Sequence, residues 1–120
     1  MRYWPHPVET NGVCNLPGIY RWLIDGAPVY VGRFTHASRP LKEYHRNVER
    51  LLNGKPYRPR KPDGFRRIHK ALAEAVTLER TISIEIVENV EPELLNIREK
   101  FWIEQIEPHL RLNGRENSCP

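Results

Sequence analysis

The amino-acid sequence predicts one domain of the α+β class, a small antiparallel three-stranded sheet flanked by helices in the order β-β-α-α-β-α. Near the N-terminus, two segments rich in β-branched and aromatic residues flank an Asp25-Gly26 turn signal. A later segment alternates isoleucine with polar residues, as a half-buried strand does. The remaining apolar residues recur at helical spacing, and 120 residues is the length of one domain.

The chain divides by composition into three parts. Residues 1–16 are interrupted by prolines and an Asn-Gly pair, and they predict an irregular arm that packs across the domain or contacts a partner. Residues 17–114 contain all the periodic segments and form the predicted core. Residues 115–120 form a short polar tail.

Residues 18–24 and 28–32 are the predicted strands of a β-hairpin, and its register decides where two tyrosines point. If Asp25-Gly26 is a two-residue turn, Tyr20 and Tyr30 lie on opposite faces of the sheet. If the loop has three residues and also includes Ile24, the tyrosines are direct cross-strand partners on one face. The local sequence allows both registers.

Two helices are predicted after the hairpin. Ser38 is a suitable N-cap for a helix over residues 39–52, and Asn53-Gly54 is suited to end it. A basic, proline-containing loop follows. Asp63 is then suited to cap a second helix that begins near Gly64.

The last predicted strand covers residues 81–87, and a third helix follows from Glu91-Pro92 to about Ile106. Within that helix Glu99 lies in the middle of an apolar stripe, which consists of Leu95, Trp102, Ile103 and Ile106. Desolvating a carboxylate costs several kcal/mol unless it is paired, protonated or bound to a metal. The sequence leaves open an internal ion pair, for example with Arg39, and a functional carboxylate.

Charge is divided unevenly along the chain, whose net charge is +4. Residues 33–70 contain twelve Lys and Arg against three acids, whereas residues 71–107 contain nine acids against three bases. This division favours a face that binds a polyanion such as nucleic acid, the alternative being two differently charged solvated surfaces. The polar N-terminus lacks the apolar core of a signal peptide, which predicts a cytoplasmic protein.

The sequence resembles the GIY-YIG nuclease family in several motifs that occur in the family's order. These are GIY at 18–20, YVG at 30–32, an arginine entering the first helix, a glutamate in REKFWI, and an asparagine in Leu112-Asn113. The resemblance covers roughly residues 17–114, and it implies the family's fold, phosphodiester cleavage and one divalent metal, Mg²⁺ or Mn²⁺. Because both tyrosines of the family serve one pocket, it also implies the three-residue hairpin loop.

The same resemblance implies the site residues, namely Tyr20, Tyr30, Arg39, Glu99 and Asn113, with Arg46 as the alternative to Arg39 and His45 as an assisting group. Glu99 is the implied metal ligand. The implied site arginine holds the phosphate, and Tyr20 is the preferred general base, provided that a nearby cation lowers its pKa.

DNA is the expected partner, with RNA as the alternative nucleic acid. The expected phosphate contacts come from basic residues, namely Arg33, Arg46, Lys55, Arg58, Arg60, Lys61, Arg66 and Arg67. Target recognition would use a homodimer or a partner protein, because no recognition domain is appended. The alternative function is a nucleic-acid-binding module on the same fold with weak or no catalysis.

Overall fold

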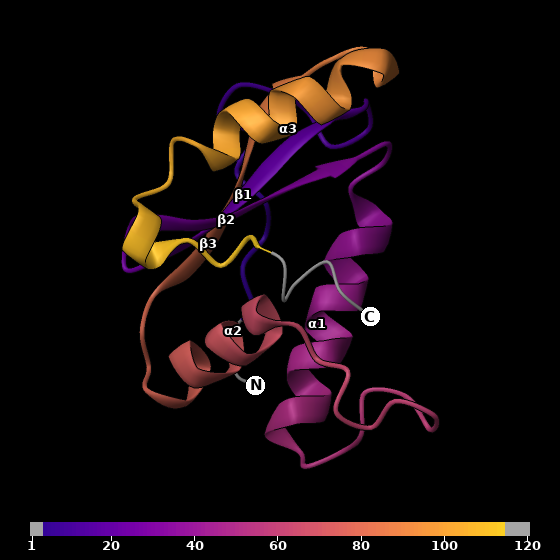
Figure 1. Ribbon diagram of the computed structural model, residues 1–120, viewed down its shortest axis with the longest axis vertical. Coiled ribbons are helices and arrows are strands. Elements are labelled where there is room, and N and C mark those ends of the chain that lie inside the picture. The colour runs from indigo at the N-terminus through magenta and orange to yellow at the C-terminus, as the bar shows by residue number, and fades with distance from the viewer. Residues whose placement is uncertain (1–3, 115–120) are drawn as a thin grey trace.

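The protein is described by a computed structural model that covers residues 4–114, so the predicted tail at 115–120 lies outside the described residues. An antiparallel sheet of three strands lies between helices on both of its faces (Figure 1). This arrangement confirms the predicted α+β class. No helix among the described residues is long and apolar enough to cross a membrane.

The sheet consists of β1 (Gly18–Ile24), β2 (Ala27–Phe34) and β3 (Ile82–Asn89). The order β2-β1-β3 places β1 in the centre and β2 at an edge. β3 begins one residue later and ends two residues later than predicted. β1 is buried along both of its faces because helices cover the sheet on both sides.

The hairpin turn has two residues, so the predicted three-residue loop is wrong. Asp25 and Gly26 have φ angles of 51° and 81°, and Ile24 pairs with Ala27. Two successive left-handed residues form the mirror-image turn that matches the right-handed twist of paired strands.

A β-bulge nevertheless keeps the two tyrosines on one face of the sheet. The register shifts between Trp22 and Leu23, so that Trp22 pairs with Tyr30 and Tyr20 pairs with Gly32. Tyr20 and Tyr30 are therefore diagonal neighbours in one buried cluster rather than direct partners.

α1 (Ser38–Leu52) and α2 (Arg67–Thr77) cover that face of the sheet. α1 matches its predicted range, but Ala37 rather than Ser38 occupies the N-cap position. Its predicted end is confirmed, since Asn53 is the C-cap and Gly54 has a left-handed φ of 69°.

α2 begins later than predicted, and Asp63 does not cap it. The Gly64 N–H donates to the Lys61 carbonyl in a turn of the preceding loop. Arg66 is the N-cap residue, and its N–H donates to Nδ1 of His69 at 3.1 Å. The His69 ring, at the third helical position, accepts the N–H of the N-cap residue, while residues 61–64 form a turn of the preceding loop.

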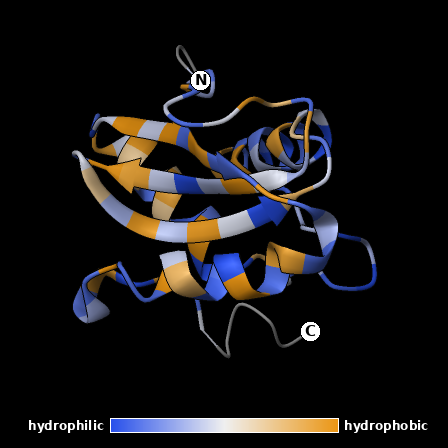
Figure 2. Ribbon diagram, turned by 90° about the horizontal axis from the view of Figure 1, so that it is seen from above, coloured by the Kyte–Doolittle hydropathy of each residue, from blue (hydrophilic) through white to orange (hydrophobic). Residues whose placement is uncertain are grey.

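α3 (Leu95–Ile103) follows a 3-10 turn at Pro92–Leu94 and lies alone along the opposite face of the sheet (Figure 2). It ends three residues before the predicted end at Ile106. Leu95 and Ile106 pack with the residues of that face, which are Ile19, Val31 and Val87.

The N-terminal arm is irregular, as predicted, and runs along the outer side of β3. The Val8 N–H donates to the Ile84 carbonyl, and the Ile86 N–H donates to the Val8 carbonyl, both at 2.9 Å. The arm therefore covers part of a strand edge that would otherwise be open to pairing with another chain.

Candidate functional site

The candidate site is built around the Tyr20 ring, which lies across the edge strand β2. Gly32 is opposite Tyr20, and a Cβ atom at Gly32 would collide with the Tyr20 ring and hydroxyl. Glycine is therefore required at position 32 because the Tyr20 ring lies too close for a side chain, and not because of the backbone conformation. Its position explains why a glycine ends the YVG motif.

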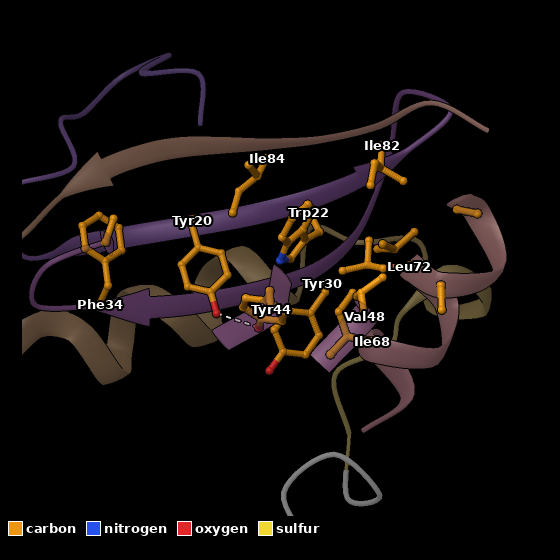
Figure 3. Close-up of a cluster of buried hydrophobic side chains, with 14 of the residues drawn as sticks. Tyr20, Trp22, Tyr30, Phe34, Tyr44, Val48, Ile68, Leu72, Ile82 and Ile84 are labelled. Carbon is orange, nitrogen blue, oxygen red and sulfur yellow. Dashed lines mark hydrogen bonds between the residues drawn. The ribbon is translucent and has the colours of Figure 1, made fainter. Parts of the chain in front are cut away.

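Three tyrosine rings meet beneath β1 and β2 (Figure 3). The hydroxyls of Tyr20 and Tyr44 share a hydrogen bond of 2.7 Å, and the rings of Tyr30 and Tyr44 lie 6.4 Å apart. The Tyr30 hydroxyl accepts a hydrogen bond from Nη1 of Arg66 at 3.0 Å. The cluster thus joins both strands of the hairpin to α1 and to the start of α2.

Burial controls the protonation of this cluster. Burial, with a smaller contribution from Tyr30, raises the pKa of Tyr20 above its ordinary value, and burial also raises the pKa of Tyr44. Both hydroxyls therefore stay protonated at neutral pH. Tyr20 is equipped to donate and accept hydrogen bonds as a neutral phenol, which does not favour the general-base role implied for it by the family resemblance.

Arg66 is the arginine that reaches the tyrosines. Its guanidinium lies 5.8 Å from the centre of the Tyr30 ring and 5.7 Å from that of Tyr44. Among residues 4–114 it has no carboxylate partner. A partly buried guanidinium without an acid favours binding an anion, because its charge is otherwise uncompensated.

Behind Arg66 lies a buried histidine. Because Nδ1 of His69 accepts the Arg66 N–H, the neutral ring carries its proton on Nε2, which lies 3.4 Å from Nδ2 of Asn47. Turning the Asn47 carboxamide over lets its Oδ1, which is buried without a partner, accept this proton. Burial, together with the charges of Arg66 and Arg58, lowers the pKa of His69 to about 3. His69 is therefore neutral at physiological pH and fixes the start of α2.

A polar cavity of about 380 Å³ opens onto this cluster. Its wall is formed by α1, the loop before α2 and the tyrosines, with Tyr20, Glu43, Tyr44, Tyr57, Arg58 and Arg66 among its residues. Hydroxyl and guanidinium donors converge there on one space, an arrangement suited to the oxygens of a phosphate group.

Glu99 comes from α3, which is on the other side of the sheet. Its side chain is half-buried, and among the described residues it makes no hydrogen bond or ion pair. Burial raises the pKa of the Glu99 carboxyl, and Arg33 offsets part of the rise. Glu99 also adds to the raised pKa of Tyr20, so the two groups interact electrostatically although their elements cover opposite faces.

A single unpaired carboxylate fits a hard divalent cation that keeps several waters and shares a substrate phosphate. No group of three His, Cys, Asp or Glu residues gathers within residues 4–114. The ion pair considered from the sequence as an alternative is not formed with Arg39 or with any other described arginine.

The structure does not bring the other implied residues of α1 into the tyrosine cluster. The Arg39 side chain is 87% exposed, and its Nε lies 3.6 Å from Oε1 of Glu43. Arg46 is also exposed. The His45 ring lies 5.0 Å from the Trp4 ring, and its Nε2 is 4.0 Å from Glu49.

Asn113 holds the edge strand in place. Its Oδ1 accepts from the Val31 N–H at 2.9 Å, and its Nδ2 donates to the Val31 carbonyl at 2.8 Å. The carboxamide therefore pairs with the outer edge of β2 as a neighbouring strand would. Val31 adjoins Tyr30, so the position of Asn113 is structural support for the site.

The expected phosphate-binding residues are mostly on the surface. Lys55, Arg58, Arg60 and Lys61 are exposed in the loop before α2, where a bridge between Arg58 and Lys61 forms a tight turn. Arg33 is exposed near the end of β2, and Arg67 donates to the Arg111 carbonyl at 3.4 Å. Of these residues, Arg58 lines the polar cavity itself.

Sequence reasoning missed four parts of this cluster. Arg66 was expected only among the DNA contacts, and Tyr44, Asn47 and His69 were given no role in the site. A signal for His69 exists, because it falls at helical spacing between Phe65 and Leu72. No local signal identifies Arg66, because the loop conformation decides where its side chain points.

Comparison with known proteins gives no match to any family model, curated protein or solved structure.

Proposed function

We propose that the protein is a metal-dependent endonuclease that hydrolyses phosphodiester bonds in DNA. The observation that carries this proposal is the convergence of Tyr20, Tyr44 and Arg66 on one polar cavity, with Tyr30 hydrogen-bonded to Arg66. Glu99, which makes no ion pair among the described residues, contributes to the raised pKa of Tyr20. The exposed basic loop beside the cavity supports a polyanionic substrate. The cytoplasmic location predicted from the sequence is part of the same proposal.

In this proposal Arg66 takes the phosphate-binding role that the family resemblance gave to Arg39. It has the required free donors, and it is positioned by its hydrogen bond to the Tyr30 hydroxyl. Its positive charge offsets the charge that develops on the phosphate oxygens in the transition state.

Tyr20 and Tyr30 have different roles in the proposed reaction. Tyr20 remains a neutral phenol and donates to a phosphate oxygen or to the attacking water. Tyr30 orients the Arg66 guanidinium through their hydrogen bond, and the attacking water releases its proton to solvent as its oxygen bonds to phosphorus. The bond to the leaving oxygen then breaks, and that oxygen takes a proton from solvent.

Glu99 would hold the divalent metal, Mg²⁺ or Mn²⁺. When bound, the metal supplies Lewis-acid stabilisation of the phosphate. Arg33 remains near enough to Glu99 to favour its ionised form, the form that a hard cation requires.

The test is nicking of supercoiled plasmid with Mg²⁺ or Mn²⁺, with EDTA as the blank. We expect Tyr20→Phe to lower the rate by about 10²-fold and Arg66→Ala by about 10²–10³-fold, and Glu99→Gln to abolish metal-dependent cleavage. Arg39→Ala is the matched control and should cleave at nearly the wild-type rate, because its side chain is 87% exposed.

Two outcomes would change this assignment. Loss of activity in Arg39→Ala with activity retained in Arg66→Ala would restore Arg39 as the site arginine. A pure preparation that cleaves no duplex, branched or single-stranded DNA with either metal would contradict the nuclease proposal.

A second function is favoured by the burial of the tyrosines. Tyr20 and Tyr30 are 6% and 7% exposed, and the Tyr20 hydroxyl is already bonded to Tyr44. A nucleic-acid-binding module without catalysis would use them only as core residues. Affinity for DNA in EDTA, without cleavage when metal is added, would support this alternative.

A further inference from the structure

The outer side of α3 carries an apolar stripe. Leu94, Ile97 and Phe101 are 43%, 65% and 41% exposed. Their spacing of three and four residues places them on one side of the helix. Leu95 and Ile106 are on the opposite side, packed against the sheet.

This stripe is unlike the other exposed apolar residues of the described chain. Those residues are distributed over the arm and the ends of α1 and α2, namely Val8, Val13, Leu16, Leu52 and Leu78. Single exposed side chains are ordinary, whereas a contiguous stripe marks an interaction surface. No other described element lies beyond α3 in Figure 2.

The charge around the stripe argues against nucleic acid as its partner. Residues 91–107, which form α3 and its two flanking segments, contain five acids against two bases. A surface of this sign repels phosphate, so the occupant is a protein.

The stripe is self-complementary in one orientation. In this orientation, the α3 helices of two copies pack antiparallel with their stripes in contact, and the two-fold axis passes beside Ile97. Leu94 precedes that centre by three residues and Phe101 follows it by four, so Leu94 of one copy meets Phe101 of the other. The two Ile97 side chains then pack together at the centre.

The charges on one flank of the stripe obey the same symmetry, whereas Arg98 on the other flank is paired with Glu88 and lies over the Phe101 ring, 4.3 Å from its centre. Glu93 precedes Ile97 by four residues and Lys100 follows it by three, and both are exposed on the same flank of the stripe. In the antiparallel pair Glu93 of each copy faces Lys100 of the other. A parallel pair would instead place Glu93 and Lys100 of each copy against the Leu94 and Phe101 side of the other, without a charged partner.

We propose that the protein forms a two-fold symmetric dimer in solution through antiparallel packing of α3 about Ile97. The contact is small for a protein interface, so the dimer is reversible, with a dissociation constant on the order of micromolar to tens of micromolar. Glu99 is on the sheet side of α3 and remains outside the interface.

The test is analytical ultracentrifugation of the full chain from about 1 to 300 µM, a range around that dissociation constant, without DNA or metal. Wild type should shift from monomer to dimer across this range, and Ile97→Lys should stay monomeric. Leu78→Lys, on another surface, is the matched control and should dimerise as wild type does. A wild type that is monomeric throughout, or a dimer unaffected by Ile97→Lys, would overturn the proposal.

A charge exchange tests the orientation. Glu93→Lys and Lys100→Glu should each weaken the dimer several-fold, because each places like charges together across the interface. The double variant Glu93→Lys/Lys100→Glu should restore the wild-type affinity. Single variants that dimerise as strongly as wild type, or a double variant weaker than both, would rule out the antiparallel pairing. Neither result depends on nuclease activity.

Discussion

At the scale of single residues, the candidate site depends on groups whose surroundings change their chemistry. Tyr20 is a residue type that can serve as a general base. Burial raises its pKa, however, so its hydroxyl stays protonated at neutral pH. His69 is an ordinary histidine in sequence, yet it is neutral and holds the backbone of Arg66. In both cases burial, rather than residue type, decides the protonation state.

His69 should make the free energy of unfolding depend on pH. Its pKa is about 3 in the folded protein and near 6.5 in the unfolded chain, so between these values only the unfolded chain binds the proton. Its contribution is complete above about pH 6.5 and is lost as pH falls towards 3, at up to ~1.4 kcal/mol per pH unit. Urea unfolding at pH 7.5, 6 and 5 should show a shallower pH slope for His69→Gln than for wild type. Equal slopes would mean that His69 is already protonated in the folded state.

At the scale of elements, the edge strand β2 is positioned by three local devices. The Asp25-Gly26 turn begins the strand, and the bulge opposite Trp22 and Leu23 returns Tyr30 to the face of Tyr20. Asn113 then pairs with the outer edge of the strand. With the two-residue turn alone, Tyr20 and Tyr30 would point to opposite faces of the sheet. The bulge shifts the register by one residue and so places both on the same face.

Asn113→Ala should lower the free energy of unfolding by about 1–3 kcal/mol, because it leaves the Val31 N–H and carbonyl without their partner. Amide hydrogen exchange at Val31 should become faster. Asn113→Asp keeps the acceptor and loses the donor, so its effect should be intermediate. Asn96→Ala, at an exposed position of α3, is the control and should change stability by less than about 0.5 kcal/mol. An unchanged rate of amide hydrogen exchange at Val31 in Asn113→Ala would show that Asn113 does not hold the edge strand.

At the scale of the whole molecule, the sheet separates two surfaces with different predicted partners. α1, α2 and the basic loop form one side with the tyrosine cavity, and α3 forms the other with its apolar stripe. Glu99 lies on α3, on the second side of the sheet. Its charge contributes to the raised pKa of Tyr20, which lies on the first side. Under the two proposals, DNA and a second copy of the chain would therefore occupy different surfaces.

The basic loop should dominate the salt dependence of DNA binding under the proposed function. Replacing Lys55, Arg60 and Lys61 together by glutamine should reduce the slope of log affinity against log salt concentration by up to about 3, since each phosphate contact contributes ~0.9. Fluorescence anisotropy with a labelled duplex in EDTA measures this slope. Arg80→Gln, in the acidic half of the sequence, should leave it unchanged. A loop variant with the wild-type slope would place the DNA on another surface.

Much of the fold was predictable because it depends on local pattern. The hairpin, the isoleucine strand and the helices follow from side-chain periodicity and turn residues, and the structure confirms them to within a few residues. The start of α2 was not predictable, because a histidine three residues into the helix replaces the expected cap. The hairpin register was not predictable from the turn, because one bulge changes it.

The sequence by itself determined the order of the elements, the division of charge, and the presence of Tyr20, Tyr30 and Glu99 as exceptional residues. Only the tertiary structure decided which arginine reaches the tyrosines, that Tyr44 joins them, and that Glu99 belongs to a helix on the opposite face of the sheet. The physical reason is that periodicity and capping act over a few residues. Contacts between Tyr30 and Arg66, or between Val31 and Asn113, depend on how separate elements pack.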